Sequence, residues 1–214
     1  MLMLPRSFER AAEMAKSSKQ WLRRHATDPY VRQARQQGYR SRAAFKLLQI
    51  DAKENILKPG QLVVDLGAAP GGWSQVAARK VKPGGRVLAI DLLPIAPISG
   101  VTVLKGDFRG ELLPRALEGA RADVVLCDVA PNLSGIGNVD QARTLELTLA
   151  AIDFCCTVLE PEGVFVAKAF HGEAFEALLR RLKASFRRVK VLKPLASRGE
   201  SAETYVVARG VGAL

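Results

Sequence analysis

Residues 63–74 read VVDLGAAPGGWS. A short β-branched run ends in an acid, Asp65, and passes through a glycine-rich turn into a helical pattern. This order is typical of a nucleotide-shaped pocket at the carboxyl end of a parallel strand. Glycines let the backbone of such a turn approach a ligand closely, because no Cβ intervenes. We therefore expect Gly67, Gly71 and Gly72 to lie against a bound ligand.

Strand-like and helical patterns alternate along most of the chain. Strands are predicted over residues 62–66, 86–91, 101–105, 123–127, 164–169, 189–192 and 204–208. Helices are predicted between most of them, over residues 72–80, 111–120, 139–159 and 173–186. This alternation indicates an α/β fold with a parallel, doubly wound sheet. No helix separates the last two strands, which predicts a hairpin and one antiparallel edge.

The region before the turn has signals for helix starts and ends. Asp28 is expected to cap a helix with Pro29 in its first turn. Gly38 is expected to end that helix, and Ser41 is expected to cap the next one. An earlier helical and basic pattern covers residues 6–26, with Trp21 and Leu22 among its apolar side chains.

The charge is large and unevenly distributed. The chain has a formal net charge of +11. Residues 1–60 carry 13 Lys and Arg against 5 acids, residues 61–179 carry 10 against 14, and residues 180–198 carry 8 and no acid. Two basic ends around a slightly acidic middle predict a polyanionic partner such as a nucleic acid. The alternative is a basic charge that serves solubility alone.

The cysteines and histidines do not form a metal-binding pattern. Cys127, Cys155 and Cys156 lie in apolar runs, and His25 and His171 are isolated. The spacing predicts buried free thiols and no metal or disulfide framework. No apolar run approaches the ~20 residues of a membrane span, and the apolar start is short for a secretory signal. We expect a cytoplasmic protein without membrane attachment, and a monomer, because nothing in the sequence demands a dimer.

Acids follow four of the predicted strands. Asp65, Asp91, Asp107 and Asp128 each stand at or just after a strand end, so in a parallel sheet they would share one rim. Asp91 lies 24 residues after Gly67, roughly the offset of an acid that accepts hydrogen bonds from ribose hydroxyls. Each acid could instead only form a turn at its strand end.

Two details favour S-adenosylmethionine over NAD as the ligand. Pro70 removes a backbone donor that a pyrophosphate would need. A second acid, Asp107, suits the amino group of an adenine on a ligand without a diphosphate. An NAD-linked dehydrogenase is the competing enzyme class.

Four further residues suggest a catalytic group. Lys168 lies in a continuous apolar strand pattern, where a lysine is rare unless it is paired. Asp128 directly follows another apolar strand, Glu203 opens the last strand, and Lys46 lies in the basic leader. The alternative for each is structural: a turn for Asp128, a lysine that reaches solvent at a strand end for Lys168, and a solvated surface for Lys46 and Glu203.

The sequence resembles the FtsJ-like ribosomal RNA 2′-O-methyltransferases over roughly residues 20–209. The motifs that carry the resemblance lie at residues 38–47, 65–74, 91–94, 106–108, 128–135, Lys168 and 197–207. The family implies a class I S-adenosylmethionine-dependent methyltransferase fold, a Rossmann-like sheet of seven strands with one reversed. Its catalytic tetrad falls on Lys46, Asp128, Lys168 and Glu203. Its cofactor contacts fall on Gly71, Trp73, Asp91, Asp107 and Asp128.

The resemblance implies 2′-O-methylation of a uridine ribose in 23S rRNA, within the 50S subunit, with S-adenosylhomocysteine as the product. Residues 61–214 would form the methyltransferase domain, and residues 1–60 a basic helical extension that packs on it and contacts RNA. A tRNA or mRNA-cap methyltransferase is the alternative within the enzyme class. A catalytically silent RNA-binding factor for ribosome assembly is the alternative outside it.

The residues suggest how such an enzyme would work. Lys168 would act as general base toward the ribose 2′-hydroxyl, and Asp128 would hold it near the methyl donor. Glu203 would orient Lys168 or Lys46, and Lys46 would fix the ribose or its phosphate. The expected contacts to RNA phosphates are Arg32, Arg35, Arg40 and Arg42, each of which could equally belong to a solvated helix face.

Overall fold

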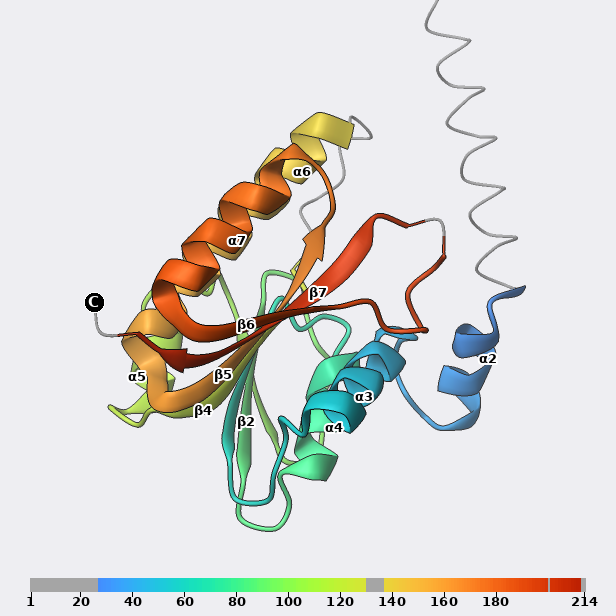
Figure 1. Ribbon diagram of the computed structural model, residues 1–214. Helices are drawn as coiled ribbons and strands as arrows, with labels where there is room; N and C mark the ends of the chain where they lie inside the picture. The colour runs from blue at the N-terminus through green and yellow to red at the C-terminus, as the bar shows by residue number, and fades with distance from the viewer. Residues whose placement is uncertain (1–26, 130–136, 200, 213–214) are drawn as a thin grey trace, which may run out of the picture.

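The fold is built on one seven-stranded sheet (Figure 1). A computed structural model describes residues 27–129, 137–199 and 201–212. The predicted helix over 6–26, with Trp21, Leu22 and the isolated His25, lies outside the described residues. The strands are β1 (Leu62–Leu66), β2 (Arg86–Asp91), β3 (Val101–Lys105), β4 (Ala122–Cys127), β5 (Leu159–Phe170), β6 (Phe186–Leu192) and β7 (Glu203–Val211).

The order of the strands is β3-β2-β1-β4-β5-β7-β6. The first five in this order are parallel, whereas β7 runs antiparallel to both β5 and β6. The predicted α/β fold is therefore confirmed, including the hairpin of the last two strands. The order reverses beside β1, and ligands of such sheets bind at this switch point.

Helices cover both faces of the sheet, as a doubly wound fold requires (Figure 1). The helices α3 and α4 pack on one face, where Leu47, Ile50, Val63 and Val76 are buried together. The helices α5, α6 and α7 pack on the other face, around Phe165. The helices are α2 (Pro29–Gln36), α3 (Ala43–Glu54), α4 (Gly72–Lys80), α5 (Leu112–Leu117), α6 (Gly137–Val158) and α7 (Glu173–Ser185).

The helix signals before the sheet are confirmed with one exception. The Asp28 side chain accepts a hydrogen bond from the Tyr30 backbone N–H at 3.0 Å and so caps α2. Gly38 follows the end of α2 with φ +68°, a conformation that favours glycine. The predicted cap of α3 by Ser41 is wrong, because its buried hydroxyl packs against Gly72 and has no hydrogen-bond partner in the part of the chain that the structure describes.

The three cysteines are free, as predicted, but only Cys127 and Cys155 are buried, whereas Cys156 is half-buried. Burial raises the pKa of the Cys127 thiol to about 12 and that of Cys155 well above its ordinary value. Both thiols are therefore protonated and unreactive near neutral pH. Among the described residues, none of the helices has the length and apolar character of a membrane span.

Candidate active site

A hollow of about 350 Å³ opens at the carboxyl ends of β1, β2, β3 and β4. Four of the residues predicted to bind the cofactor line it, namely Gly67, Asp91, Asp107 and Asp128. Apolar side chains complete the wall, among them Ile90, Leu92, Leu93, Phe108, Val129 and Leu147. The mixture of apolar surface and a few acids is typical of a site for a small polar ligand with an aromatic part.

The turn after β1 is shaped for close approach. Gly67 has φ +68°, and a Cβ there would lie 2.5 Å from Cγ1 of Val129. Gly71, with φ +106°, packs instead against Ile98 and Arg40. Only Gly67 of the three predicted glycines therefore faces the hollow.

Trp73 and Gly72 have structural contacts behind the turn. The indole N–H of Trp73 donates to the Ala43 carbonyl at 2.8 Å, which ties α4 to α3. The indole ring lies 5.7 Å from the ring of Tyr205. Neither Gly72 nor Trp73 lines the hollow, so their predicted cofactor contacts stay predictions.

Asp91 fixes the backbone around the hollow. One carboxylate oxygen accepts the Ala69 N–H at 2.9 Å, and the other accepts the Leu93 N–H at 2.8 Å. The acid thus joins the glycine-rich turn after β1 to the segment after β2. Each carboxylate oxygen retains a lone pair for a ribose hydroxyl.

Asp107 is held by a residue that the sequence reasoning missed. The guanidinium of Arg109 binds the Asp107 carboxylate in a bidentate pair, with its shortest contact at 2.6 Å. These hydrogen bonds lower the pKa of Asp107, so the carboxylate is ionised at neutral pH. In the sequence, the signal for this ion pair was the position of Arg109 two residues after Asp107.

Asp65 lies under the turn and is fully buried. Its Oδ2 accepts the Ser74 hydroxyl at 2.5 Å, whereas its Oδ1 has no partner among the described residues. Burial raises its pKa to about 7, and the negative charges of Asp128 and Asp91 add to this effect. Asp65 is therefore poised between its neutral and ionised forms near neutral pH.

Lys168 and Asp128 form a buried pair beside the hollow. The Lys168 Nζ donates to the Asp128 backbone carbonyl at 3.0 Å and lies 3.2 Å from Asp128 Oδ1. The lysine side chain is only 8% exposed, so its partner is essential for its burial. Because Asp128 also lines the hollow, the pair connects the ligand pocket to the centre of the sheet.

Lys46 and Glu203 form a second pair next to the first. The Lys46 Nζ reaches Glu203 Oε1 at 2.7 Å and Oε2 at 2.8 Å. The Ser197 hydroxyl also donates to Glu203 Oε1, at 2.9 Å. Of the two partners considered for Glu203, the structure selects Lys46.

Tyr205 links the two pairs and was not identified from the sequence. Its hydroxyl lies 3.2 Å from Asp128 Oδ1, and its ring carries the Lys46 ammonium at 5.5 Å from the centroid. Tyr205 is also the register partner of Lys168 in the β5–β7 ladder. Burial and the nearby acids Asp128 and Glu203 raise its pKa well above the ordinary value, so the phenol is a stable donor.

The four predicted RNA-contacting arginines lie in two different settings. Arg32 and Arg35 are exposed on α2. Arg40 donates to the backbone carbonyls of Pro70, Ala96 and Pro97, and Arg42 forms an ion pair with Asp28 at 2.5 Å. The guanidiniums of Arg40 and Arg42 are thus engaged within the protein.

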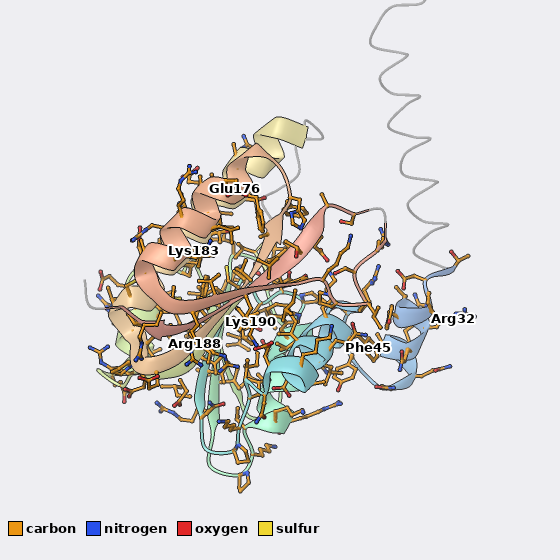
Figure 2. All side chains as sticks on the ribbon, viewed as in Figure 1. Arg32, Phe45, Glu176, Lys183, Arg188 and Lys190 are labelled. Atoms are coloured by element: carbon orange, nitrogen blue, oxygen red, sulfur yellow. The ribbon has the colours of Figure 1, made fainter. Side chains whose placement is uncertain are left out.

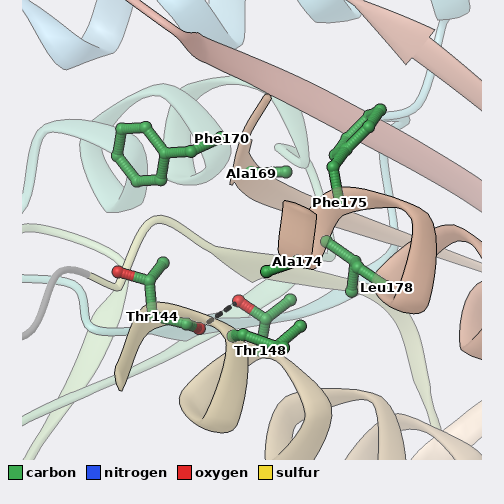
Figure 3. A pocket seen from close by; sticks show the side chains of 8 residues that line it. Thr144, Thr148, Ala169, Phe170, Ala174, Phe175 and Leu178 are labelled. Atoms are coloured by element: carbon green, nitrogen blue, oxygen red, sulfur yellow. Dashed lines mark hydrogen bonds between the residues drawn. The ribbon is translucent and has the colours of Figure 1, made fainter. Parts of the chain in front are cut away.

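Another hollow lies between α6, α7 and the end of β5, around Thr144, Thr148, Phe170 and Phe175 (Figure 3). Its volume of about 20 Å³ admits no more than a water molecule. The Thr148 hydroxyl is already satisfied by the Thr144 carbonyl at 2.8 Å. This hollow is not a substrate site.

The comparisons with known proteins agree with this geometry. The family model described as FtsJ-like methyltransferase matches residues 39–211. A protein of Marinobacter nauticus named ribosomal RNA large subunit methyltransferase E is 51% identical over 200 residues, which cover 92% of this chain and 97% of that one. A protein of the same name from Nitrosospira multiformis is 49% identical over 199 residues, which cover 91% and 97%.

Solved structures show the same fold. A Plasmodium falciparum protein, described provisionally as a ribosomal RNA methyltransferase, has a TM-score of 0.72 and 28% identity, and the match covers 81% of this chain and 98% of that one. A SAM-dependent O-methyltransferase from Thermotoga maritima has a TM-score of 0.55 and 18% identity, and the match covers 77% and 64%. The second likeness concerns the fold alone.

Proposed function

Because the chain belongs to the FtsJ-like methyltransferase family, we propose that it methylates the 2′-hydroxyl of a uridine ribose in 23S rRNA of the large ribosomal subunit. Membership confirms the predicted family and enzyme class, and with them S-adenosylmethionine as the methyl donor. The names of the relatives support ribosomal RNA as the substrate class. The observation that carries the proposal is that Asp128 both lines the ligand pocket and holds Lys168.

The pocket fits S-adenosylmethionine. Asp91 offers carboxylate oxygens for the ribose hydroxyls, and the ionised Asp107 offers an acceptor for the adenine amino group. Gly67 keeps the floor open where any Cβ would collide with Val129. When bound, S-adenosylmethionine supplies an electrophilic methyl group for in-line transfer to the ribose oxygen.

Lys168 manages the proton of the attacking hydroxyl. As general base, Lys168 Nζ would take the 2′-proton while the oxygen forms its bond to the methyl carbon and the bond from that carbon to sulfur breaks. The products are the 2′-O-methyl ribose, S-adenosylhomocysteine and the Lys168 ammonium. Asp128 stabilises this ammonium at 3.2 Å, and its backbone carbonyl fixes the direction of Nζ.

Lys46 positions the nucleotide. The Glu203 carboxylate and the face of Tyr205 hold its ammonium in place, and Ser197 holds Glu203 in turn. A fixed cation beside Lys168 can bind the ribose or its phosphate and present the 2′-oxygen for attack. The two ion pairs lie side by side, joined through Tyr205, and so act as one group.

Lys168→Ala tests the mechanism. We expect methyl transfer to fall at least 10²-fold, while S-adenosylmethionine still binds, because Lys168 does not line the cofactor pocket. Single-turnover methylation and equilibrium dialysis measure the two quantities. Lys53→Ala, which changes an exposed lysine on α3, is the control. A Lys168→Ala protein that still turns over would contradict the assignment.

The substrate is identified by offering radiolabelled S-adenosylmethionine with tRNA, naked 23S rRNA and 50S subunits. Label on one uridine ribose of 23S rRNA is the expected result, and we propose that the 50S particle is the better acceptor. Label confined to tRNA or capped mRNA would move the enzyme to another RNA class. RNA binding without any methyl transfer would indicate a catalytically silent assembly factor.

One copy of the chain contains the pocket and all four catalytic residues. We therefore propose that the enzyme acts as a monomer, which light scattering after size-exclusion chromatography would measure. An enzyme of ribosomal subunits works where they are assembled, so the proposed substrate implies a cytoplasmic location.

A further inference from the structure

A second large hollow lies on the outer side of the cofactor turn. It has a volume of about 340 Å³ and is formed by Arg40 in the segment between α2 and α3, by α4 with Lys82 just after it, and by the loop between β2 and β3. None of its lining residues lines the cofactor pocket. Its charged lining residues, Arg40, Arg79 and Lys82, are all basic, and the remaining polar ones are Gln75 and Ser99. Among the described residues, no carboxylate lines it.

Two of these side chains are held in fixed positions. Arg40 donates to three backbone carbonyls, at 3.2 Å to Pro70, 2.6 Å to Ala96 and 2.7 Å to Pro97. The guanidinium of Arg79 stacks on the ring of Tyr39, 4.5 Å from its centroid. Stacking leaves the N–H edge of Arg79 free to donate, and a planar guanidinium in a fixed orientation suits an oxyanion.

The charges of Arg79 and Lys82 are not neutralised within the described part of the chain. Their neighbour Lys80 differs, because its Nζ forms an ion pair with Asp51 at 2.8 Å. Lys190 likewise pairs with Glu54 at 3.0 Å. The hollow therefore contains two cations without an ion-pair partner, next to the guanidinium of Arg40. Repulsion among these three positive charges destabilises the folded state, and a bound anion would relieve it.

We propose that this hollow binds a backbone phosphate of the RNA substrate, outside the cleft where the ribose is methylated; the inference rests on the proposed function. The position of the hollow relative to α2 and α3 supports this proposal. The segment with Tyr39 and Arg40 joins α2, which carries the exposed Arg32 and Arg35, to α3, which carries Lys46. An RNA strand that follows this segment toward Lys46 passes the opening of the hollow.

The double variant Arg79→Gln with Lys82→Gln tests the proposal. Affinity for a 23S rRNA transcript should fall about tenfold at low salt, and the slope of log K against log salt should shrink by about one. The kcat at saturating RNA and the KM for S-adenosylmethionine should stay unchanged. Filter binding over a salt series and initial rates measure these quantities.

The matched control is Arg86→Gln with Arg115→Gln, which removes two exposed charges elsewhere. Equal RNA affinity in the two double variants overturns the proposal. Loss of inorganic phosphate binding with intact RNA affinity also overturns it, in favour of a small-anion site. A raised KM for S-adenosylmethionine alone would assign the hollow to the cofactor turn. If the wild-type protein does not methylate 23S rRNA, the proposed function fails instead.

Discussion

The turn after β1 depends on one residue that has no side chain. At Gly67 two separate conditions exclude a Cβ: the positive φ of +68° and the approach of Val129 to 2.5 Å. Gly38 shares the same φ of +68° but has no atom within 4 Å of an added Cβ. A comparison of the two glycines therefore separates the energetic cost of the left-handed backbone from the cost of a steric clash.

Gly67→Ala and Gly38→Ala should both lose about 1 kcal/mol of stability to the left-handed backbone. Gly67→Ala should lose a further ~1–3 kcal/mol, because the new methyl group displaces Val129. Its affinity for S-adenosylmethionine should also fall at least tenfold. Urea unfolding and calorimetric titration measure both effects. Equal losses of stability in the two variants would show that the Val129 side chain can move aside without a measurable cost.

Asp65 makes stability depend on pH. Its pKa is about 7 in the folded protein and near 3.8 when exposed, so the folded state binds the proton more tightly. The stabilisation by this proton is complete below pH 3.8 and is lost as the pH rises through 7.

Asp65→Asn cannot ionise and should remove this dependence. Between pH 5 and pH 8 the wild-type free energy of unfolding should fall by about 3 kcal/mol relative to the variant. Denaturant unfolding at several pH values measures this difference. Parallel pH curves for the two proteins would show that the Asp65 carboxyl is already solvated in the native state.

Among the elements, β6 is one of the two edge strands of the sheet, because it pairs only with β7, as β3 at the other edge pairs only with β2. Its exposed side chains include Arg187, Arg188 and Lys190, of which Arg188 and Lys190 are labelled in Figure 2. Charges on an edge strand hinder pairing with another chain. The basic character of β6 thus hinders pairing of this edge with another chain and also adds to the net charge.

Arg188→Val with Lys190→Val should leave the fold intact, since both side chains are exposed and the carboxylate of Glu54, the partner of Lys190, keeps Arg209 at 4.0 Å. The variant should nevertheless aggregate faster on mild heating, because its edge is apolar. Light scattering against time measures the rate. Lys53→Ala with Arg115→Ala removes the same charge from helix surfaces. Matching rates in both double variants would attribute the effect to net charge alone.

The elements also show what the sequence could and could not predict. The bounds of β1, β2, β3 and α4 agree with the prediction at both ends, because a clear apolar run or a glycine marks each end. The strand β5 extends back to Leu159, through Pro161 and Gly163, where no strand signal exists. Local pattern also could not place β7 between β5 and β6, since strand order depends on long-range packing.

The candidate site also has features that the sequence predicts and features that it does not. Acids at strand ends predicted one rim, and Asp91, Asp107 and Asp128 line one hollow, whereas the fourth acid, Asp65, is buried beneath the turn and does not line it. Which cation pairs with Glu203 could not be predicted, because Lys46 lies 157 residues away in the chain. The three hydrogen bonds from Arg40 to backbone carbonyls could not be predicted either, since the sequence does not distinguish Arg40 from the other basic residues before β1.

For the whole molecule, charge is the dominant property. The net charge is +11, and Figure 2 shows Arg32 on α2 well apart from Lys183 on α7 and Arg188 on β6. Basic groups on separate parts of the surface can contact separate parts of a large RNA. Affinity should then come from many weak phosphate contacts in addition to the catalytic cleft.

Rising salt should therefore weaken RNA binding steeply, with a linear fall of log K against log salt. Binding of S-adenosylmethionine should change little over the same range, since its pocket is lined by both acids and apolar groups. Fluorescence anisotropy for RNA and calorimetry for the cofactor make the comparison. RNA affinity that stays constant would remove electrostatics as its main source.

The reversal of β7 has a consequence for how the enzyme matures. Because β7 runs opposite to its neighbours, its first residue, Glu203, reaches the rim where the other strands end. Of the four proposed catalytic side chains, Glu203 is thus the last to be translated. A nascent polypeptide that has not yet reached Glu203 lacks the carboxylate that holds Lys46, so the proposed catalytic group is completed only when this strand has been made.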